Sequence, residues 1–570
     1  MQDIDMIDPL TLEEASIATS IHLRSDKDVV IPPSTTAAVH LGLDPNEDEL
    51  FRLLVGTADA FSKGDIDLEE GWPNNQRPST VVIRVAGGWV RDKILQEYGG
   101  AYDVDLAVEH MTGVQLATLI QAYVHKYHPH IQASRMGVIA ANPAQSKHLE
   151  TATFKLCGID MDLSNLRAHE VYTEDSRIPT VHLGTPKEDA LRRDFTVNAL
   201  FYNLHSQQVE DWTGRGVRDL LQEKTLVTPL EPVQTFRDDP LRILRAIRFA
   251  VRLQFRVDDS LKEAAQLPEI RQALSVKVSR ERFGKELEGC LSGKQAKPLL
   301  ALMTLVDLGL ACIVFALPQP GLDKIGGVHG HLLGKEYDAG NANQAISGWI
   351  ESRHLLTITG PLWERFDSMV QSTHSADSRL LPLTAALLPF RHLQYHEAKK
   401  PERVHSAIGY IVQESIKFKK VDVAALTLLN ENVDSMVELL DNVTKVQRLE
   451  AGMLLRSLRE LWPTALLLAT ILKVRNEPSV DWMAEAEKLY HKIATEYALD
   501  QSWKMKPLLD GKVLQLSFGK GPIVGLYMQE QIRWMLSNPD GGAEQCLQHL
   551  QAFEPDSTSA EPKKKKAHIG

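Results

Sequence analysis

The chain has 570 residues, 43% of them hydrophobic and 24% charged, which is typical of a soluble globular protein with roughly three or four domains. Its longest apolar stretch, TALLLATILKV near residue 470, is about half of what a bilayer-spanning helix needs, so it predicts a buried core helix and no membrane partner. Of the net charge of −12, −9 lies in residues 1 to 50, where eleven acids face two bases, and the near-neutral remainder does not exclude a nucleic-acid partner.

Residues 1 to 45 are acidic, lack sustained periodicity and contain IPPS and LDPNEDE, so we expect a loosely ordered lead-in. The start lacks both the basic region of a secretory signal and the arginine-rich face of a transit peptide, so the protein is not expected to be secreted. The four cysteines are far apart and form no CxxC or Cys/His motif. Neither disulfides nor a zinc site are expected, and a reducing compartment is indicated.

The segments VVIRVAGG (81 to 88) and YDVDLAVEH (102 to 110) predict two strands, with a short helix in WVRDKILQEY between them. Residues 151 to 167 predict two further strands joined at the Gly158 turn. Because the connections are short, the sheet should be mixed or antiparallel. The first 200 residues therefore predict a small α+β domain.

Asp103 and Asp105 alternate with Val104 and Leu106, so the two-residue period of a strand puts both carboxylates on one face. Two carboxylates on one face repel each other unless a cation lies between them, and hard oxygen ligands favour Mg²⁺. Two surface aspartates on a half-exposed strand are the structural alternative.

Gly87 and Gly88 precede this pair at a strand-to-helix junction, where bare backbone N–H groups can hold phosphate. A dinucleotide-binding turn is a weaker interpretation, because GGWVRD lacks the third glycine of GxGxxG and the acidic pair follows too early. A phosphate cradle beside a metal pair predicts phosphoryl transfer.

Two later segments extend the expected site. Asp160 and Asp162 share one face of the predicted strand GIDMDLSNLR, and one of them would complete a pair of metal ions. In EDALRRDFTVNALFYN, Arg193 would clamp a triphosphate and Asp194 would accept from ribose hydroxyls. A salt-bridge cluster at a helix start is the alternative for this second segment.

The segment FRDDPLRILRAIRFAVR predicts a helix with its aspartates at the N-cap and Pro240 at the first helical position. Arg242, Arg245 and Arg248 follow at a spacing of three, so all three share one broad helical face with Asp239.

A carboxylate and a guanidinium side by side can distinguish nucleobases. The carboxylate accepts from an amino group and the guanidinium donates to a ring nitrogen, which fits both adenine and cytosine. Guanine and uracil present a carbonyl and an N–H instead, and the mismatch costs several kcal/mol where water is excluded. An Asp/Arg pair therefore predicts selection of C and A without a nucleic-acid template.

GGWVRD, DVD, RRDFTVNAL and DDPLRILRAIRFAVR, in this order and at these distances, resemble the class II tRNA nucleotidyltransferases, the CCA-adding enzymes. KPLLDGKVL and IRWMLSNP are similar to the C-terminal region of fungal members. The resemblance implies template-independent addition of C, C and A to the 3′ end of tRNA from CTP and ATP, with release of pyrophosphate.

Two alternatives remain at this point. A poly(A) polymerase or an A-only enzyme shares the same head and neck. A catalytically inactive RNA-binding protein on this fold is disfavoured, because uncompensated acids in a phosphate-binding cleft would weaken RNA binding.

The resemblance also implies residue roles. Asp103 and Asp105 hold Mg²⁺ ions, Asp162 assists, and Asp239 with Arg242 pairs with the incoming base. The further nucleotide-binding residues are expected to be Gly87, Gly88, Arg91, Arg193, Asp194, Arg245 and Arg248.

Two further motifs match the family. Asp211 and Gly214 of EDWTGRGVRDL stand where members have a flexible hinge, although an ordinary turn explains them equally well. VSRERFGKELEGCL is similar to the neck-stabilising helix, so we expect a structural, salt-bridged role for Arg280, Arg282 and Glu286.

The implied fold is α+β: a polymerase-β-like nucleotidyltransferase head with a mixed or antiparallel sheet, followed by an all-helical neck, body and tail. The tail should bind the tRNA acceptor arm by shape and phosphate contacts, and the protein should act as a monomer in the cytoplasm, nucleus or mitochondrion. Lys563 to Lys566 form either a nuclear-import patch or a solvated lysine tail. The expected regions are an acidic N-terminus (1–45), head (46–203), neck (204–292), body (293–430), tail (431–555) and a disordered basic C-terminus (556–570).

Overall fold

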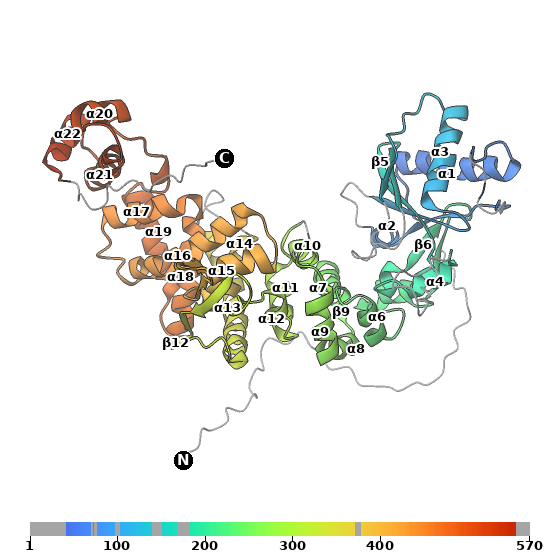
Figure 1. Ribbon diagram of the computed structural model, residues 1–570, viewed down its shortest axis with the longest axis horizontal. Coiled ribbons are helices and arrows are strands. Elements are labelled where there is room, and N and C mark those ends of the chain that lie inside the picture. The colour runs from blue at the N-terminus through green and yellow to red at the C-terminus, as the bar shows by residue number, and fades with distance from the viewer. Residues whose placement is uncertain are drawn as a thin grey trace, which may run out of the picture. The chain divides into compact units, whose positions relative to one another are not determined.

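The computed structural model describes residues 41–69, 72, 77–96, 103–139, 151–167, 183–293, 295–370 and 378–554 (Figure 1). The chain forms two compact units. The head unit comprises the described residues up to 187 together with 200–217, and the helical unit comprises 188–199 and the described residues from 218 on. In the part of the chain that is described, no helix is both long and apolar enough to cross a membrane.

A seven-stranded mixed sheet, in the order β3-β4-β5-β2-β1-β6-β7, is the centre of the head unit. β2 and β5 pair in parallel, and the other neighbours pair antiparallel, which confirms the expected mixed sheet. The strands are β1 (Ile83–Ala86), β2 (Val104–Val108), β3 (Gly137–Ile139), β4 (Thr151–Leu156), β5 (Ile159–Asn165), β6 (Leu200–Asn203) and β7 (Gln208–Asp211).

One face of this sheet is apolar and covered by helices. α1 (Pro45–Lys63) and α3 (Gly113–Tyr127) pack side by side in the head unit and α3 lies against β4 and β5 (Figure 1). Gly113 permits this close approach, because a Cβ atom there would lie 1.9 Å from the carbonyl oxygen of Leu163. The opposite face of β2 and β5 is therefore the one that remains available for polar side chains.

α1 corrects the expectation of a loose lead-in at LDPNEDE. Asp44 accepts hydrogen bonds from the backbone N–H groups of Asn46 and Glu47, and Glu47 accepts one from the Asp44 N–H. Pro45 occupies the first helical position. The polar residues that suggested a loop are thus a capping box, which satisfies the backbone donors at a helix start. Residues 1–40 lie outside the described residues.

A buried ion pair fixes α2 (Gly88–Ile94) against α1. The side chains of Lys93 and Glu47 are 5% and 3% exposed, and Nζ lies 2.6 Å from the carboxylate. Glu47 also accepts from Trp89 Nε1 at 3.0 Å. One carboxylate therefore holds the helix that follows the Gly87–Gly88 turn.

The helical unit confirms the expected helical character, and α18 is the buried helix predicted from TALLLATILKV. From residue 186 on, the described α-helices are α4 (Pro186–Leu191), α5 (Gly216–Arg218), α6 (Pro232–Asp238), α7 (Arg242–Leu253), α8 (Asp259–Gln266), α9 (Pro268–Lys277), α10 (Arg280–Leu291), α11 (Pro298–Asp307), α12 (Ala311–Val314), α13 (Ala342–Met369), α14 (Leu380–Leu387), α15 (Ala407–Tyr410), α16 (Lys420–Asp441), α17 (Arg448–Leu458), α18 (Trp462–Asn476), α19 (Trp482–His491), α20 (Gly511–Phe518), α21 (Ile523–Ser537) and α22 (Ala543–Ala552).

The sequence predicted an all-helical neck, body and tail, but this mainly helical unit also contains short strands. They are β8 (Thr225–Leu226) with β9 (Arg256–Val257), the three-stranded sheet of β10 (Ile325–His329), β13 (Gln394–Glu397) and β14 (Lys400–Ser406), and the pair β11 (His331–Leu332) with β12 (Lys335–Glu336). Two-residue strands and polar or glycine-rich ones carry no apolar alternation, so the sequence offered no strand signal there.

Two expected domain boundaries also differ from the structure. β7 belongs to the head sheet, so the head continues beyond residue 203 to residue 217. The expected boundary between body and tail at residues 430 and 431 falls inside α16. Leucine- and alanine-rich composition is similar on both sides of that position, so composition does not mark a boundary there.

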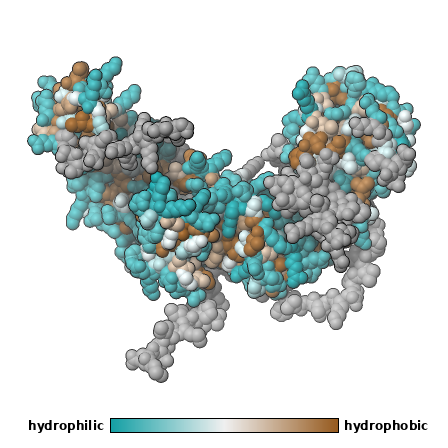
Figure 2. All heavy atoms as spheres, in the orientation of Figure 1, coloured by the Kyte–Doolittle hydropathy of each residue, from teal (hydrophilic) through white to brown (hydrophobic). Residues whose placement is uncertain are grey.

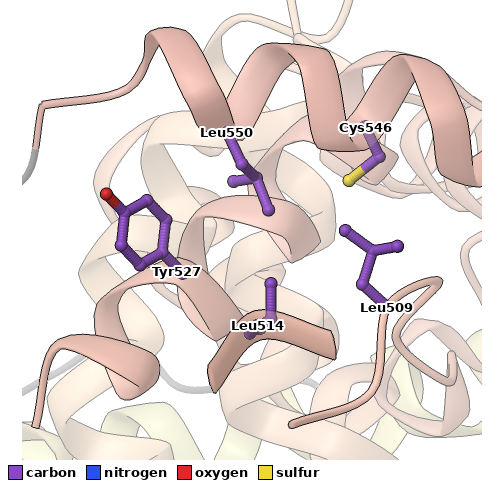
Figure 3. Packing of buried hydrophobic residues seen from close by; sticks show 5 residues of the cluster. All are labelled: Leu509, Leu514, Tyr527, Cys546 and Leu550. Carbon is purple, nitrogen blue, oxygen red and sulfur yellow. The ribbon is translucent and has the colours of Figure 1, made fainter. Parts of the chain in front are cut away.

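α20, α21 and α22 enclose a small apolar core at the end of the described chain, with side chains that point toward one another (Figure 3). Asp510 caps α20, so KPLLDGKVL contains the start of α20, and IRWMLSNP contains the end of α21. The face drawn in Figure 2 is mainly hydrophilic, with hydrophobic residues in scattered patches. The core consists of Leu509, Leu514, Tyr527, Cys546 and Leu550.

The Glu47–Lys93 pair should stabilise the head. Lys93→Met leaves a buried carboxylate without its ammonium partner, which typically costs about 3–5 kcal/mol. Hydrogen exchange of peptides from α1 and α2 in the full chain should therefore accelerate on the order of 100-fold or more. Lys63→Met, which removes an exposed lysine of α1, should change exchange little. Equal exchange in the two variants would contradict a stabilising role for the pair.

Candidate active site

The two predicted carboxylates of β2 lie on the open face of the head sheet. Asp103 and Asp105 are exposed, whereas Val104 and Leu106 are buried. Asp105 is the register partner of Asp162 in the parallel pair of β2 and β5. Neighbouring strands lie about 5 Å apart, so three carboxylates from two strands gather on one face.

The two carboxylates of β5 have different neighbours. Asp160 Oδ2 lies 3.0 Å from Nζ of Lys155 on β4, and the two side chains are 59% and 50% exposed. Asp162 stands beside Asp105 instead. This difference favours Asp162 as the third carboxylate of the site, and it assigns Asp160 to a surface ion pair.

The donor set suits a hard divalent cation that arrives with a phosphate ligand. Among the residues that the structure describes, no three His, Cys, Asp or Glu side chains are close enough to enclose a metal ion by themselves. Mg²⁺ is usually held by one or two protein carboxylates together with waters and substrate phosphates. Asp103 and Asp105, with Asp162 alongside, fit such a partial site.

The Gly87–Gly88 turn lies at the same end of the sheet as these carboxylates. The β1–β2 register pairs Val85 with Leu106, so the turn after β1 comes beside the start of β2. Gly87 has a φ of 71°, which favours glycine. A Cβ atom on Gly88 would meet only Arg91 Nη2 among the described residues, at 3.8 Å. Among the described residues, the turn thus has space beside the Arg91 guanidinium, which pairs with Asp92 at 2.6 Å and belongs to a side chain that is only 8% exposed.

A cavity of about 340 Å³ opens on the other side of the carboxylates. Period-two alternation in TATFK puts Lys155 on the same face as Asp160, so this residue was accessible to sequence reasoning. Arg135 precedes a short exposed strand that carries no apolar pattern, and no local signal marks it. The polar lining side chains that the sequence did not single out are Ser134, Arg135, Thr153 and Lys155.

Arg84 is a second residue that the sequence did not single out, because it sits inside the apolar run of β1. Its guanidinium is 2.6 Å from Glu210 and 2.8 Å from Glu109, and its side chain is 7% exposed. Burial by itself raises the pKa of Glu210. Hydrogen bonds from Arg84, Asn203 and Trp212 outweigh this effect and bring the pKa below its usual value. Arg84 therefore ties β1, β2 and β7 together.

In the helical unit, Asp194 is buried and accepts three hydrogen bonds. Its donors are the Phe195 N–H at 2.8 Å, Asn198 Nδ2 at 3.1 Å and the Arg245 guanidinium at 2.7 Å. Burial raises the pKa of Asp194, but Arg245 and the hydrogen bonds lower it below its usual value. The sequence predicted a contact between Asp194 and ribose. Instead, this carboxylate is buried, because the apolar residues that follow RRD pack into the core. The salt-bridge alternative describes Asp194 better.

Arg193 remains closer to its expected role. Its guanidinium pairs with Asp189 at 2.9 Å, and the side chain is 26% exposed. A partly exposed arginine can exchange such a partner for a phosphate.

The arginines of α7 share one face as expected, but two of them have internal partners. Arg245 lies between Asp194 and Glu286, and Arg248 Nε lies 2.6 Å from Glu286. Arg248 also stacks on the Phe249 ring at 4.2 Å and is 14% exposed. These contacts are internal to the helical unit, and the phosphate or base contacts expected for Arg245 and Arg248 stay a prediction. The internal contacts confirm the structural role expected for Glu286 in α10.

Asp239 corrects the expected N-cap of α7. α6 ends at Asp238, Asp239 is extended (φ −142°, ψ 99°), and Leu241 precedes α7. The reason is Pro240, which disfavours helical geometry in the residue before it. Extended backbone therefore separates α6 from α7 at the position where the sequence predicted the N-cap of a helix.

Asp239 and Arg242 keep hydrogen-bonding capacity for a ligand. Asp239 accepts from the Leu241 N–H at 3.1 Å and from Arg282 at 2.7 Å, while a carboxylate has about four acceptor positions. Arg242 donates to the carbonyls of Arg192 at 2.6 Å and Thr235 at 3.4 Å, and it carries five N–H groups. Burial lowers the pKa of Arg242, and nearby aspartates oppose this effect.

The expected hinge motif is a hydrogen-bonded turn. The Asp211 carboxylate accepts from the N–H groups of Thr213, Gly214 and Val217, each at 3.1 Å. Gly214 has a φ of 74°. The head unit ends at residue 217, directly after this turn, and motion there stays a prediction.

The fold and the carboxylate face define a nucleotidyltransferase, and residues 83–226 match the Poly A polymerase head domain. The mitochondrial CCA tRNA nucleotidyltransferase of Saccharomyces cerevisiae is 34% identical over 84% of this chain and 90% of its own length. The tRNA nucleotidyltransferase cca2 of Schizosaccharomyces pombe is 35% identical, over 90% and 99%. The chain therefore belongs to the CCA tRNA nucleotidyltransferase family.

Solved structures agree on the fold. A CCA-adding enzyme in an apo form has a TM-score of 0.55 and 18% sequence identity, and the similarity covers 90% of this chain and 96% of that one. The Thermotoga maritima CCA-adding enzyme complexed with tRNA has a TM-score of 0.53 and 19% identity, over 90% and 96%.

The buried Asp194 should make stability depend on pH. Because its pKa is lower in the folded than in the unfolded protein, its stabilisation is present above about pH 4 and is lost as pH falls through the folded pKa. Asp194→Asn should lower the free energy of unfolding on the order of 3 kcal/mol at pH 7. The difference from the wild type should shrink below about pH 4, as measured by urea unfolding.

The matched control is Asp323→Asn, which neutralises an exposed aspartate of the same unit and should have little effect at any pH. A destabilisation by Asp194→Asn that stays constant down to pH 3.5 would contradict the assignment of a buried, charged carboxylate.

Proposed function

We propose that this protein adds C, C and A to the 3′ end of tRNA, using CTP and ATP and releasing pyrophosphate. The observation that carries the proposal is the gathering of Asp103, Asp105 and Asp162 on one open sheet face beside the Gly87–Gly88 turn. The head alone does not distinguish this activity from polyadenylation. The relatives that match most of the chain are tRNA nucleotidyltransferases, and they favour CCA addition.

The reaction is a displacement at the α-phosphorus of the nucleotide. The 3′-hydroxyl oxygen of the RNA bonds to this phosphorus, the bond to the bridging β-phosphate oxygen breaks, pyrophosphate leaves and the hydroxyl proton passes to solvent. A divalent metal ion, for which we propose Mg²⁺, would neutralise phosphate charge and lower the pKa of the hydroxyl. Asp103 and Asp105 would hold it, with Asp162 beside them.

The remaining residues bind and orient the substrates. Gly88 and Arg91 would receive the triphosphate, because in the described part of the chain only Arg91 Nη2 comes within 4 Å of a Cβ atom placed on Gly88. Arg193 stays predicted as a further phosphate ligand. Asp239 would accept from the amino group of C or A, and Arg242 would donate to the adjacent ring nitrogen.

We assign the substrates and the compartment by family. Related CCA-adding enzymes have been solved with tRNA, with ATP and with CTP, and we propose the same three ligands here. The relatives from Saccharomyces cerevisiae and Candida glabrata are named mitochondrial, so we propose that this protein works in the mitochondrion. Action in the cytoplasm and nucleus, and as a monomer, remains a prediction.

Asp103→Asn tests the carboxylate face. Loss of one metal-binding carboxylate removes several kcal/mol of transition-state stabilisation, so incorporation should fall on the order of 1,000-fold. Binding of tRNA, measured by gel shift, should stay nearly unchanged. Asp59→Asn makes the same charge change at an exposed position of α1 and should leave incorporation intact. Normal activity in Asp103→Asn would remove this face from the mechanism.

A second test concerns the choice of base. Given tRNA without its CCA end and CTP alone, the wild type should add two cytidines and stop. Asp239→Asn gives the site an amide that can also donate to a carbonyl, so the preference for CTP over UTP should fall about tenfold or more. This ratio is independent of the fraction of folded enzyme. Asp259→Asn, an exposed control of equal charge change, should keep the preference, and an unaltered preference in Asp239→Asn would contradict the assignment.

A further inference from the structure

The open face of the head sheet continues beyond the carboxylates to two basic residues. The antiparallel register of β4 and β5 pairs Lys155 with Asp160 and Thr153 with Asp162. Lys155 is therefore one strand further from β2 than Asp160, on the same face of the sheet. It lies roughly 10 Å from the strand that carries Asp103 and Asp105.

Arg135 lies next to Lys155 across the edge of the sheet. The backbone of Ser134 donates to the Lys155 carbonyl at 2.9 Å, and the Lys155 N–H donates to Ser134 Oγ at 2.7 Å. These two bonds extend the pairing of β3 with β4 and fix the segment that carries Arg135. Its side chain is exposed.

Both cations line the cavity of about 340 Å³ that also contains Asp103 and Asp162. Sites for small ligands typically measure from about 300 Å³ upward, so this volume suits part of a nucleotide. A cavity with acids at one side and cations at the other fits a ligand that has both a reacting hydroxyl and a phosphate.

The strand order decides which substrate the cavity can hold. In a displacement at phosphorus, the attacking and leaving oxygens lie roughly in line on opposite sides. The Gly87–Gly88 turn, assigned to the triphosphate, follows β1, and β1 flanks β2 on the side away from β5. Pyrophosphate therefore leaves on the β1 side, and the attacking hydroxyl comes from the side of β5, β4 and β3.

We propose that the cavity beside Lys155 and Arg135 binds the 3′-terminal ribose and phosphate of the RNA acceptor. The inference rests on the proposed function, because it takes the Gly87–Gly88 turn as the seat of the leaving pyrophosphate. Lys155 and Arg135 are positioning residues that contact the last phosphodiester of the RNA and bring its 3′-hydroxyl to the carboxylates.

Asp160 has a supporting part in this site. Its ion pair with Lys155 joins two side chains that are about half exposed, so solvent screens the pair and it is easily rearranged. An ammonium group has three donors. Lys155 can therefore keep its bond to Asp160 and donate another to phosphate.

The first experiment compares Michaelis constants. Lys155→Ala should raise KM for tRNA lacking its CCA end about tenfold or more, the effect of losing a charge-assisted hydrogen bond. KM for CTP should stay within about twofold of the wild type. Lys155→Arg should restore most of the affinity for RNA. Lys63→Ala removes an exposed lysine elsewhere in the head and should leave both constants unchanged.

The second experiment identifies the contacted group. An acceptor RNA whose last phosphodiester is an uncharged methylphosphonate should raise KM of the wild type to the level of Lys155→Ala with normal RNA. The same substitution should have little further effect on Lys155→Ala. The salt dependence of RNA binding should also become less steep in the variant, by about one phosphate contact.

Two results would overturn the inference. One is a rise in KM for CTP instead of tRNA in Lys155→Ala, which would assign the cavity to the nucleotide. The other is an equal response of Lys155→Ala and wild type to the neutral linkage. A wild type that adds no cytidine from CTP would instead overturn the proposed function, and the inference with it.

Discussion

Carboxylates on neighbouring strands of a sheet, about 5 Å apart, repel one another unless positive charge is placed between them. Elsewhere on its open face, the head unit pairs carboxylates directly with basic side chains. Arg84 is inserted between two glutamates at one end, and Lys155 pairs with Asp160 toward the sheet edge. We assign the carboxylates in the middle of this face to a cation that enters with the nucleotide. Their mutual repulsion opposes folding, and the cation relieves this repulsion when the substrate binds.

The order of the strands then gives the reaction its direction. A glycine turn after β1 and a basic cavity beside β4 lie on opposite sides of the carboxylates, as an in-line displacement requires of a leaving and an attacking group. The opposite face of the sheet is apolar and buried under α1 and α3. The face that we assign to the substrates is thus separate from the packing that holds the strands in register.

Local patterns predicted the parts of the site that depend on local geometry. The strand period placed Asp103 and Asp105 together, and the Gly158 turn marked the hairpin. Cap and loop residues are chemically alike, so the capping box of α1 resembled a loop. Pro240 was expected to open a helix, but it keeps Asp239 extended, and α7 begins only at Arg242. The partners of Arg248 lie far along the chain, and only tertiary packing selects among the acids available to it.

The most direct test of the account measures when the metal ion binds. Mn²⁺ binding followed by electron paramagnetic resonance should be weak for the protein alone and should strengthen at least tenfold with a non-hydrolysable CTP analogue, because the described carboxylates supply only part of a coordination shell. Asp105→Asn should abolish the tight, nucleotide-dependent signal. Tight Mn²⁺ binding that needs no nucleotide and survives Asp105→Asn would contradict the assignment of this face.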